Sequence, residues 1–258
     1  MKNIITLLLI LTIASCKKEA FNPNLTKQFT IQSTSNGASY TIKVALPENY
    51  NLENQKYAAI YVLDGEENFG NVAKQCQKLS SDVLVVSIGY GYDRSVDYTP
   101  TKASMGGGGA EKFMQFIKDE LIPKMESDYA ADTARASRTI LGHSFGGLFA
   151  AYAFANYNGV FGNYLMLSPS LWYDNEILFR MEQDNRTAIS KNQQLVFMGI
   201  GALEGDGRMQ APFEGFYQRL SHNYPGIKLA KHTVPSRDHV GSKNPNITEA
   251  LNFYFQNR

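Results

Sequence analysis

The chain has 258 residues, of which 43% are apolar and 19% are charged, and its formal net charge is +1. This length and composition fit one globular domain with a well-buried core. The sequence has no basic stripe, internal repeat or low-complexity tract, so nothing in it indicates a nucleic-acid-binding protein.

The N-terminus has the pattern of a targeting segment. Lys2 precedes an apolar run over 4–13, far shorter than the ~20 residues that span a bilayer. The run leads into Ala-Ser-Cys, ending at Cys16, which resembles the lipobox of bacterial lipoproteins, whose cysteine is lipidated. We therefore predict a signal peptide over 1–15, a polar tether over 16–27, and attachment of Cys16 to a membrane of the cell envelope. The alternative is an ordinary secretory signal with an incidental cysteine.

The cysteine count fits this interpretation. Cys16 and Cys76 are the two cysteines of the chain. If Cys16 is acylated, Cys76 has no partner, so we expect no intrachain disulfide even in an oxidising compartment. Cys76 lies in a predicted helix, and we expect it to be a buried structural thiol.

From residue 28 onward, strand and helix patterns alternate, which indicates one domain over 28–258. Residues 27–34 and 39–47 alternate apolar and polar side chains, as an antiparallel pair does, and Asn36-Gly37 is a turn signal between them. Continuous apolar runs at 57–63 and 83–89 are typical of strands buried on both faces.

The rest of the chain repeats a strand followed by a helix. An amphipathic helix is expected over 110–125, with a kink at Pro123. Two early strands followed by repeated strand–helix units predict an α/β fold with a mostly parallel sheet covered by helices. Further strands are expected at 138–141, 163–168, 195–201 and 227–234, and further helices from Gly146, near 176–184, near 210–220 and near 246–257.

The motif Gly142-His143-Ser144-Phe145-Gly146 lies between the short strand RTIL and the helical segment GGLFAAYAFA. A serine on such a sharp strand-to-helix turn is the nucleophile elbow, in which the glycines allow close backbone contacts. The turn places the hydroxyl at a helix N-terminus, whose N–H groups favour negative charge. His143 is expected to point elsewhere, as a packing residue.

A nucleophilic serine needs a general base, and the chain has four histidines: His143, His222, His232 and His239. In this kind of fold the order along the chain is serine, acid, histidine. His232 lies inside the last predicted strand and His222 ends a helix. His239 lies in the loop after that strand, at its carboxyl end, and is therefore the predicted base.

The acid is expected in the loop after the preceding strand, where GIGALEGDG offers Glu204 and Asp206. Either carboxylate would accept the imidazole N–H and fix the tautomer of the base. The spacing does not choose between them. Asp238 is adjacent to His239, and neighbouring side chains diverge, so it is not expected to orient the imidazole.

Longer stretches around these residues resemble the putative-esterase family of α/β-hydrolases, and most of all its siderophore-esterase branch. The resemblance covers most of residues 57–258 and implies an α/β-hydrolase fold with no large cap domain. The stretches that carry it are YVLDGEENF (61–69), RSVDYTPT (94–101), GGGAEKFMQFIKDELIPKM (107–125), LGHSFGGLFAAYAFANYNGVFGNYLMLSPSLWYDN (141–175), GALEG (201–205) and SRDHVGS (236–242).

The resemblance implies a role for individual residues. Ser144 matches the nucleophile, His239 the base, and Glu204 a glutamate of the family's G-x-x-E loop. Some siderophore esterases of this type rely on a Ser–His dyad, which is the alternative to a role for Glu204. The backbone N–H groups of Glu66 and Phe145 match the two oxyanion donors.

Substrate contacts are implied at two further stretches. Arg94, Asp97, Tyr98 and Thr99 match a family motif near the cleft, and we expect Arg94 and Tyr98 to contact the substrate. Trp172, the single tryptophan, is expected to stack on an aromatic acyl group, although a core position is an equally reasonable interpretation.

No cofactor or metal is expected. No Cys/His spacing indicates zinc. The run Gly106–Gly109 is not followed by Gly-Lys-Ser/Thr, so it is not a phosphate-binding loop, and we expect it to form a flexible edge of the cleft.

The sequence therefore predicts an envelope serine esterase that acts on a small-molecule ester through an acyl-enzyme. A siderophore ester is the favoured substrate. Three alternatives are left open: an esterase acting on feruloyl or acetyl groups of polysaccharides, an acyltransferase, and an inactive hydrolase fold that binds a ligand. The sequence carries no signal for the oligomeric state.

Overall fold

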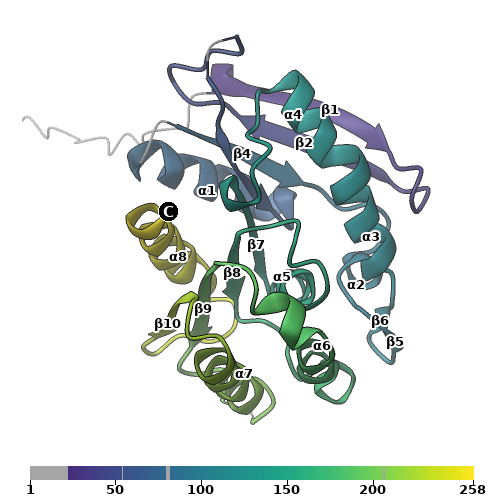
Figure 1. Cartoon of the computed structure of the whole chain (residues 1–258), viewed down its shortest axis with the longest axis vertical. Helices are drawn as coiled ribbons and strands as arrows, with labels where there is room; N and C mark the ends of the chain where they lie inside the picture. Colours follow the sequence, from purple (N-terminus) through teal and green to yellow (C-terminus); the bar gives the residue numbers. More distant parts are fainter. Residues whose placement is uncertain (1–22, 54, 80–81, 206) are drawn as a thin grey trace, which may run out of the picture.

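Eight strands form one central sheet in the computed structural model, which describes residues 23–53, 55–79, 82–205 and 207–258. Their order is β1-β2-β4-β3-β7-β8-β9-β10 (Figure 1). β2 is antiparallel to β1 and β4, and the pairs from β4 to β10 are parallel, which confirms the predicted mostly parallel sheet. The strands are β1 (Thr26–Gln32), β2 (Ser39–Ala45), β3 (Ala58–Val62), β4 (Val83–Ile88), β7 (Arg138–His143), β8 (Asn163–Leu167), β9 (Leu195–Gly201) and β10 (Lys228–Val234).

Helices cover both faces of the sheet (Figure 1). One face packs against α1 (Gly65–Leu79) and α8 (Lys243–Asn257), and Cys76 of α1 is a buried free thiol there, as predicted. The other face packs against the remaining longer helices. These and the short elements are α2 (Arg94–Asp97), α3 (Ala110–Phe116), the π-helix η2 (Ile117–Leu121), α4 (Ile122–Asp128), α5 (Phe145–Asn156), α6 (Tyr173–Ile189), α7 (Gln210–Asn223), the 3-10 turns η1 (Pro23–Leu25) and η3 (Arg135–Ser137), and the hairpin of β5 (Lys102–Ala103) and β6 (Gly106–Gly107).

The connections between strands are compact throughout the described part of the chain. From β7 to β10 each connection holds one helix, and the longer connection from β4 to β7 holds short helices that pack against the sheet. None of them forms a cap domain, as predicted. Nor does any helix within these described ranges combine the length and apolar character needed to cross a bilayer.

The N-terminal predictions fall largely outside the described residues. The signal peptide over 1–15, Cys16 and most of the tether lie there, so the structure gives no information on them. The sheet begins one residue earlier than the strand pattern at 27–34 predicts: Thr26, placed in the tether, pairs with β2 as the first residue of β1.

The helix predicted over 110–125 is divided into three parts. The π-helix η2 separates α3 from α4, and Pro123 lies at the start of α4. Proline is tolerated in the first turn of a helix, where its missing N–H costs nothing. In a continuous helix over 110–125 the Pro123 ring would clash with the preceding turn, and the π-turn of η2 relieves that clash. Glu120 of the π-turn accepts hydrogen bonds from Ser33 and Ser35 in the β1–β2 loop.

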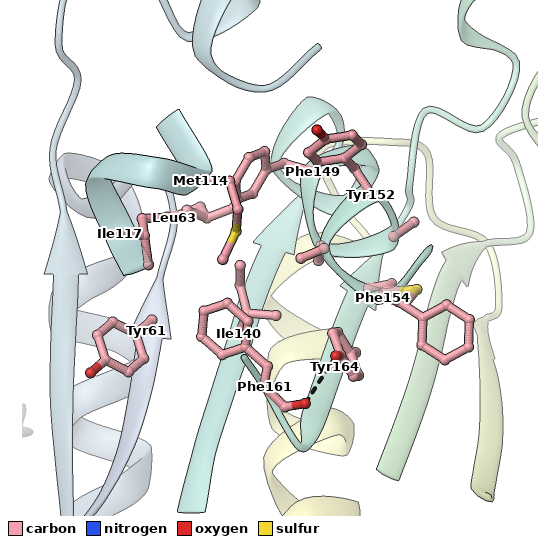
Figure 2. Close-up of a cluster of buried hydrophobic side chains, with 14 of the residues drawn as sticks. Tyr61, Leu63, Met114, Ile117, Ile140, Phe149, Tyr152, Phe154, Phe161 and Tyr164 are labelled. Atoms are coloured by element: carbon pink, nitrogen blue, oxygen red, sulfur yellow. Dashed lines mark hydrogen bonds between the residues drawn. The ribbon is translucent and has the colours of Figure 1, made fainter. Parts of the chain in front are cut away.

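The larger core lies between the sheet and α3 and α5 (Figure 2). Phe154 of α5 packs edge-on against Tyr164 of β8, and Tyr61 of β3 packs edge-on against Phe161; all four side chains are fully buried. Each such aromatic side chain contributes roughly 1.5–3 kcal/mol through burial. The buried hydroxyl of Tyr164 donates to the Phe161 carbonyl at 2.9 Å, so its burial leaves no unsatisfied polar group.

Backbone strain gathers in the loops at the carboxyl ends of the parallel strands. Asp64 (φ 53°), Ser144 (φ 60°), Ser168 (φ 40°) and Ser236 (φ 55°) follow β3, β7, β8 and β10. A positive φ costs a non-glycine residue about 1–3 kcal/mol and persists only where the surroundings impose it. The carboxyl edge of the sheet is therefore the place to look for a functional site.

We predict that Gly142→Ala destabilises the protein by about 1–3 kcal/mol or more, because an added Cβ would overlap the backbone carbonyl of Gly146. Gly159→Ala is the matched control, since that position has open space and should change stability by no more than about 0.5 kcal/mol. Urea unfolding of both variants measures the difference. Equal stabilities of the two variants would show that the close contact at the turn is not required.

Candidate active site

Ser144 lies between β7 and α5 with φ 60° and ψ −120°. Its N–H donates to the Leu167 carbonyl at the end of β8 (3.0 Å), and its carbonyl accepts the Leu148 N–H (2.9 Å). Gly142 packs directly against the backbone of Gly146, which only a residue without Cβ allows. This geometry is that of a nucleophile elbow, in which the strained turn exposes the serine hydroxyl at the carboxyl edge of the sheet.

A buried carboxylate holds the predicted base. His239 Nδ1 lies 2.7 Å from Glu204 Oε2, and the Glu204 side chain is completely buried. The other oxygen, Oε1, accepts hydrogen bonds from the Ser168 hydroxyl (2.7 Å), the Ser242 hydroxyl (2.9 Å) and the Gly201 N–H (2.6 Å). Both carboxylate oxygens are therefore satisfied without water.

These hydrogen bonds decide the charge of Glu204. Burial by itself raises the pKa of this carboxyl, but the hydrogen bonds from His239, then from Ser168, Gly201 and Ser242, outweigh it and leave the pKa below its ordinary value. An ionised carboxylate only accepts, so His239 donates a proton from Nδ1, and in the neutral tautomer that this bond selects Nε2 is the nitrogen that can accept a proton.

Ser144 and His239 line the same cavity. Among the described residues, no hydrogen bond joins their side chains, and such bonds are often long until substrate binds. The other predicted acid, Asp206, lies outside the described residues. Asp238 lines the cavity too, but its carboxylate accepts the Gly241 N–H (2.7 Å).

The two predicted oxyanion donors are placed differently. Phe145 begins α5 and lines the cavity, and the first N–H groups of a helix have no intrahelical acceptor. Glu66 does not line the cavity: it lies in a separate recess with Gly65 and Gly89, and its carboxylate accepts the Tyr90 N–H (2.9 Å). The role of the Glu66 N–H stays a prediction.

The cavity has a volume of about 480 Å³ and combines an apolar wall with two arginines. Loops that follow several parallel strands contribute to it, so it lies at the strained carboxyl edge of the sheet. The lining residues are Arg94, Met105, Ser144, Phe145, Ser170, Trp172, Leu203, Glu204, Gly205, Arg208, Met209, Asp238 and His239.

Arg94 reaches the cavity but is fixed by an ion pair. Its Nε and Nη2 donate to the two oxygens of Asp64 (2.7 and 2.9 Å), a carboxylate that is almost fully buried. Burial raises the pKa of Asp64, and Arg94 offsets part of that rise. Removing Arg94 would leave Asp64 buried without a counter-charge, so this arginine is structural as well as exposed to the cavity.

Tyr98, which the sequence assigns to substrate contact, does not line the cavity. Its side chain is 2% exposed, and its hydroxyl accepts the Asp64 N–H at 3.1 Å. The tyrosine instead supports the strained backbone at Asp64, the residue whose carboxylate forms the ion pair with Arg94. Tyr98 follows Arg94 by four residues, and the Arg94 guanidinium lies 5.3 Å from the centre of its ring, so the two side chains share one side of α2. The motif does not indicate which of the two faces the cavity.

Trp172 lines the cavity beside Arg208. The Arg208 guanidinium lies 4.5 Å from the centre of the indole ring, a cation–π geometry, and the indole N–H donates to Met209 Sδ. The sequence prediction placed Trp172 at the site but did not include Arg208. No motif marks Arg208, since only the course of its loop brings it to the tryptophan.

The turn after Trp172 is fixed by the β5–β6 hairpin. Asp174 has a left-handed backbone (φ 45°) and accepts a hydrogen bond from Thr101 Oγ1 (2.6 Å), while the Tyr173 hydroxyl donates to the Thr101 carbonyl (2.7 Å). The glycine run 106–109 is closely packed rather than flexible: an added Cβ at Gly106 would clash with Tyr173. The expectation of a flexible edge is therefore wrong.

His143 makes a contact that the sequence did not indicate. Its side chain is nearly buried, and Nε2 lies 2.9 Å from the backbone oxygen of His239. A carbonyl only accepts, so Nε2 carries the proton, and His143 is not the base. Burial first, and the neighbouring His239 second, lower the pKa of His143 to about 4.

The chain is similar to known esterases in sequence and in fold. The profile of a family described as "Putative esterase" matches residues 33–240. The ferri-bacillibactin esterase BesA of Bacillus subtilis is 27% identical over 228 residues, which cover 76% of this chain and 78% of that protein.

Two solved structures have the same fold. The BES protein of Bacillus cereus superposes with a TM-score of 0.81 at 24% identity, covering 98% of this chain and 99% of the other. An IroE-like serine hydrolase of Shewanella oneidensis gives a TM-score of 0.77 at 25% identity, covering 90% and 80%. The α/β-hydrolase fold implied by the sequence is confirmed.

Glu204→Gln should lower kcat by about 10²–10⁴, because an amide cannot hold the imidazole in the productive tautomer as a carboxylate does. Asp206→Asn, the alternative acid, should have a much smaller effect. Steady-state hydrolysis of a p-nitrophenyl ester measures both. A larger loss in Asp206→Asn would transfer the role to that residue, and small losses in both would leave a Ser–His dyad.

The buried His143 should make the protein sensitive to acid. Its pKa is about 4 in the folded chain against about 6.5 when exposed, so the unfolded state binds a proton first. The free energy of unfolding should therefore fall as the pH drops from 6.5 towards 4. The loss from pH 7.5 to pH 5 should be about 2 kcal/mol greater in the wild type than in His143→Gln.

Urea unfolding at the two pH values measures this difference, with His222→Gln as the control because that histidine is exposed at the end of α7. Equal pH dependence in the wild type and in His143→Gln would contradict the assignment of a buried, neutral His143.

Proposed function

The chain belongs to the putative esterase family, whose members are ester hydrolases, and we propose that it cleaves a siderophore ester through an acyl-enzyme on Ser144. One observation carries the mechanism. The strained serine shares a cavity with His239, and Glu204 fixes the far nitrogen of that histidine at 2.7 Å. A nucleophile, a base and a group that orients the base are the parts that acyl transfer requires.

In the proposed reaction, Ser144 Oγ attacks the ester carbonyl carbon while His239 Nε2 takes the hydroxyl proton. The imidazolium is stabilised by the ionised Glu204. The carbonyl oxygen becomes negative and accepts a hydrogen bond from the Phe145 N–H at the start of α5. The C–O bond to the alcohol then breaks, and His239 returns the proton to the departing oxygen.

The second half of the reaction uses the same groups. Water replaces the alcohol, His239 removes its proton, and the new hydroxyl oxygen attacks the acyl carbon. The bond to Ser144 Oγ breaks, the serine recovers its proton, and the carboxylic acid leaves. Each group returns to its starting state, so the cycle consumes one water for each ester.

The walls of the cavity favour an anionic aromatic acyl group. Trp172 and Phe145 line it with aromatic rings, and the Arg208 guanidinium, which also lines it, lies 4.5 Å from the centre of the indole ring. A phenolate ring can stack on the apolar wall and accept hydrogen bonds from the guanidinium. Catecholate trilactones, a class of siderophore, carry such rings on ester-linked cores.

Names of similar proteins agree with this substrate class. Besides the ferri-bacillibactin esterase, an apo-salmochelin esterase of Escherichia coli is 26% identical over 190 residues, covering 66% of this chain and 58% of that protein. The favoured assignment over feruloyl or acetyl esters rests on these relatives together with the two arginines of the cavity.

We further propose that the enzyme is attached to the cell envelope by lipid on Cys16, because the sequence before it has the form of a lipoprotein signal. Mass spectrometry of the mature N-terminus should find an acylated cysteine, and Cys16→Ser should release soluble protein. An unmodified N-terminus would contradict the anchor and leave the esterase assignment intact.

The most direct test of the substrate class is to remove a positive charge from the cavity and compare KM for charged and neutral esters. Arg208→Gln should raise KM for a catecholate trilactone about tenfold, equivalent to roughly 1.4 kcal/mol for one charge-assisted hydrogen bond. KM for a short neutral p-nitrophenyl ester should change less than about twofold. Arg94 is not used for this test, because its substitution would also leave the buried Asp64 without its counter-charge.

Arg237→Gln is the matched control, since Arg237 is an exposed arginine on the loop of His239 that does not line the cavity. The panel also contains methyl ferulate and acetylated xylan, compared by kcat/KM. If either is cleaved at least tenfold faster than every trilactone, the siderophore assignment fails while the enzyme remains an esterase. Equal losses of Arg208→Gln on charged and neutral esters would remove the charge argument.

A further inference from the structure

The nucleophile and the base come from strands that are not neighbours. Ser144 follows β7, and His239 follows β10, with β8 and β9 between them in the sheet. Adjacent strands lie about 4.8 Å apart, so these two strand ends are separated by roughly 14 Å. The loop that carries His239 must therefore extend across two strand ends to bring the imidazole near Ser144.

That loop is held firmly on the side of β9. The Leu203 N–H donates to the Arg237 carbonyl (2.9 Å), and Glu204 binds the ring of His239. Gly201 packs so closely against the Arg237 carbonyl that an added Cβ would overlap it. These contacts fix the loop to the strand that carries the acid, but they do not set its distance from the nucleophile.

A contact from β7 supplies that distance. The Nε2–H of His143, the residue before the nucleophile, donates to the backbone oxygen of His239 at 2.9 Å. The two imidazole rings also pack together, with centroids 4.6 Å apart and planes tilted by 38°. His143 and Ser144 are consecutive, so any movement of the base relative to this bond is a movement relative to the nucleophile.

We propose that His143 is a positioning residue, whose ring N–H holds the His239 backbone so that the base lies within reach of Ser144. The proposal rests on the proposed serine mechanism. His143 is not among the residues that line the cavity and acts through its contacts with His239. Its effect should therefore appear in the chemical steps, both of which use His239, and not in substrate binding.

The protonation state of His143 suits this task. Its pKa of about 4 keeps the ring uncharged at neutral pH. A neutral ring still donates its one N–H to the carbonyl, and it places no second positive charge beside His239 when that residue takes up the serine proton. An arginine or lysine at the same position would donate a hydrogen bond but would oppose the imidazolium.

The test compares His143→Gln, His143→Asn and His143→Leu in the full chain, with a short p-nitrophenyl ester as substrate. Glutamine places its amide N–H close to the position of Nε2, asparagine is too short, and leucine fills the space without a donor. We expect kcat to fall about 10–100-fold in His143→Leu and His143→Asn, because sub-ångström to 1 Å displacements of catalytic groups have effects of this size. KM should change less than about threefold, and His143→Gln should retain kcat within about threefold.

Controls separate this proposal from the mechanism it assumes. His222→Gln, at the exposed end of α7, should leave kcat and KM unchanged. His239→Ala should abolish turnover. If it does not, the proposed serine mechanism is wrong, whatever the His143 variants show. If His143→Leu does not fold, the comparison of His143→Gln with His143→Asn decides, since both are polar and smaller than histidine.

Three results would overturn the positioning role. The first is a kcat within twofold of the wild type in His143→Asn or His143→Leu. The second is a kcat in His143→Gln as low as in His143→Asn, which would mean that ring packing and not the hydrogen bond matters. The third is a loss confined to KM, which would place His143 in substrate binding.

Discussion

A carboxylate buried out of water, Glu204, is the group on which the arrangement of this site depends. Burying an ionised carboxyl is expensive unless each oxygen is hydrogen-bonded. Its donors come from the ends of different elements: Ser168 after β8, Gly201 at the end of β9, Ser242 before α8 and the ring of His239. Satisfying one charge thus fixes three loops and the base together, and the parallel sheet brings their ends to one edge.

The parts of the site that could be predicted from the sequence are those set by a local pattern or by the order of strands. The elbow at Ser144 is a local strand–turn–helix pattern, and His239 follows from the order of strands along the chain. That order left Glu204 and Asp206 open as the acid, and the resemblance to the family favoured Glu204. Contacts between loops carry no such pattern. The bond from His143 to the His239 carbonyl and the position of Arg208 on Trp172 depend on how distant loops meet. Tyr98 was misplaced for this reason, since it packs beneath the Arg94 guanidinium and accepts a hydrogen bond from the Asp64 loop, and the motif shows neither contact.

The fold itself was largely predictable, because buried parallel strands and amphipathic helices have strong periodic signals. The exceptions have local physical causes. Pairing with β2 draws Thr26 into the sheet, and Pro123 is accommodated by a π-turn rather than a simple kink. The glycines at 106–109 serve close packing against Tyr173, and a glycine run alone does not distinguish close packing from flexibility.

We propose that Ser144 becomes covalently acylated during turnover. Intact-mass spectrometry after rapid acid quench, with a slowly hydrolysed ester of a catechol acid as substrate, tests it most directly. The account predicts a transient mass increase equal to one acyl group, mapped by proteolysis to the peptide containing Ser144 and absent in Ser144→Ala. Full turnover by Ser144→Ala, or an acyl group mapped to another residue, would contradict it.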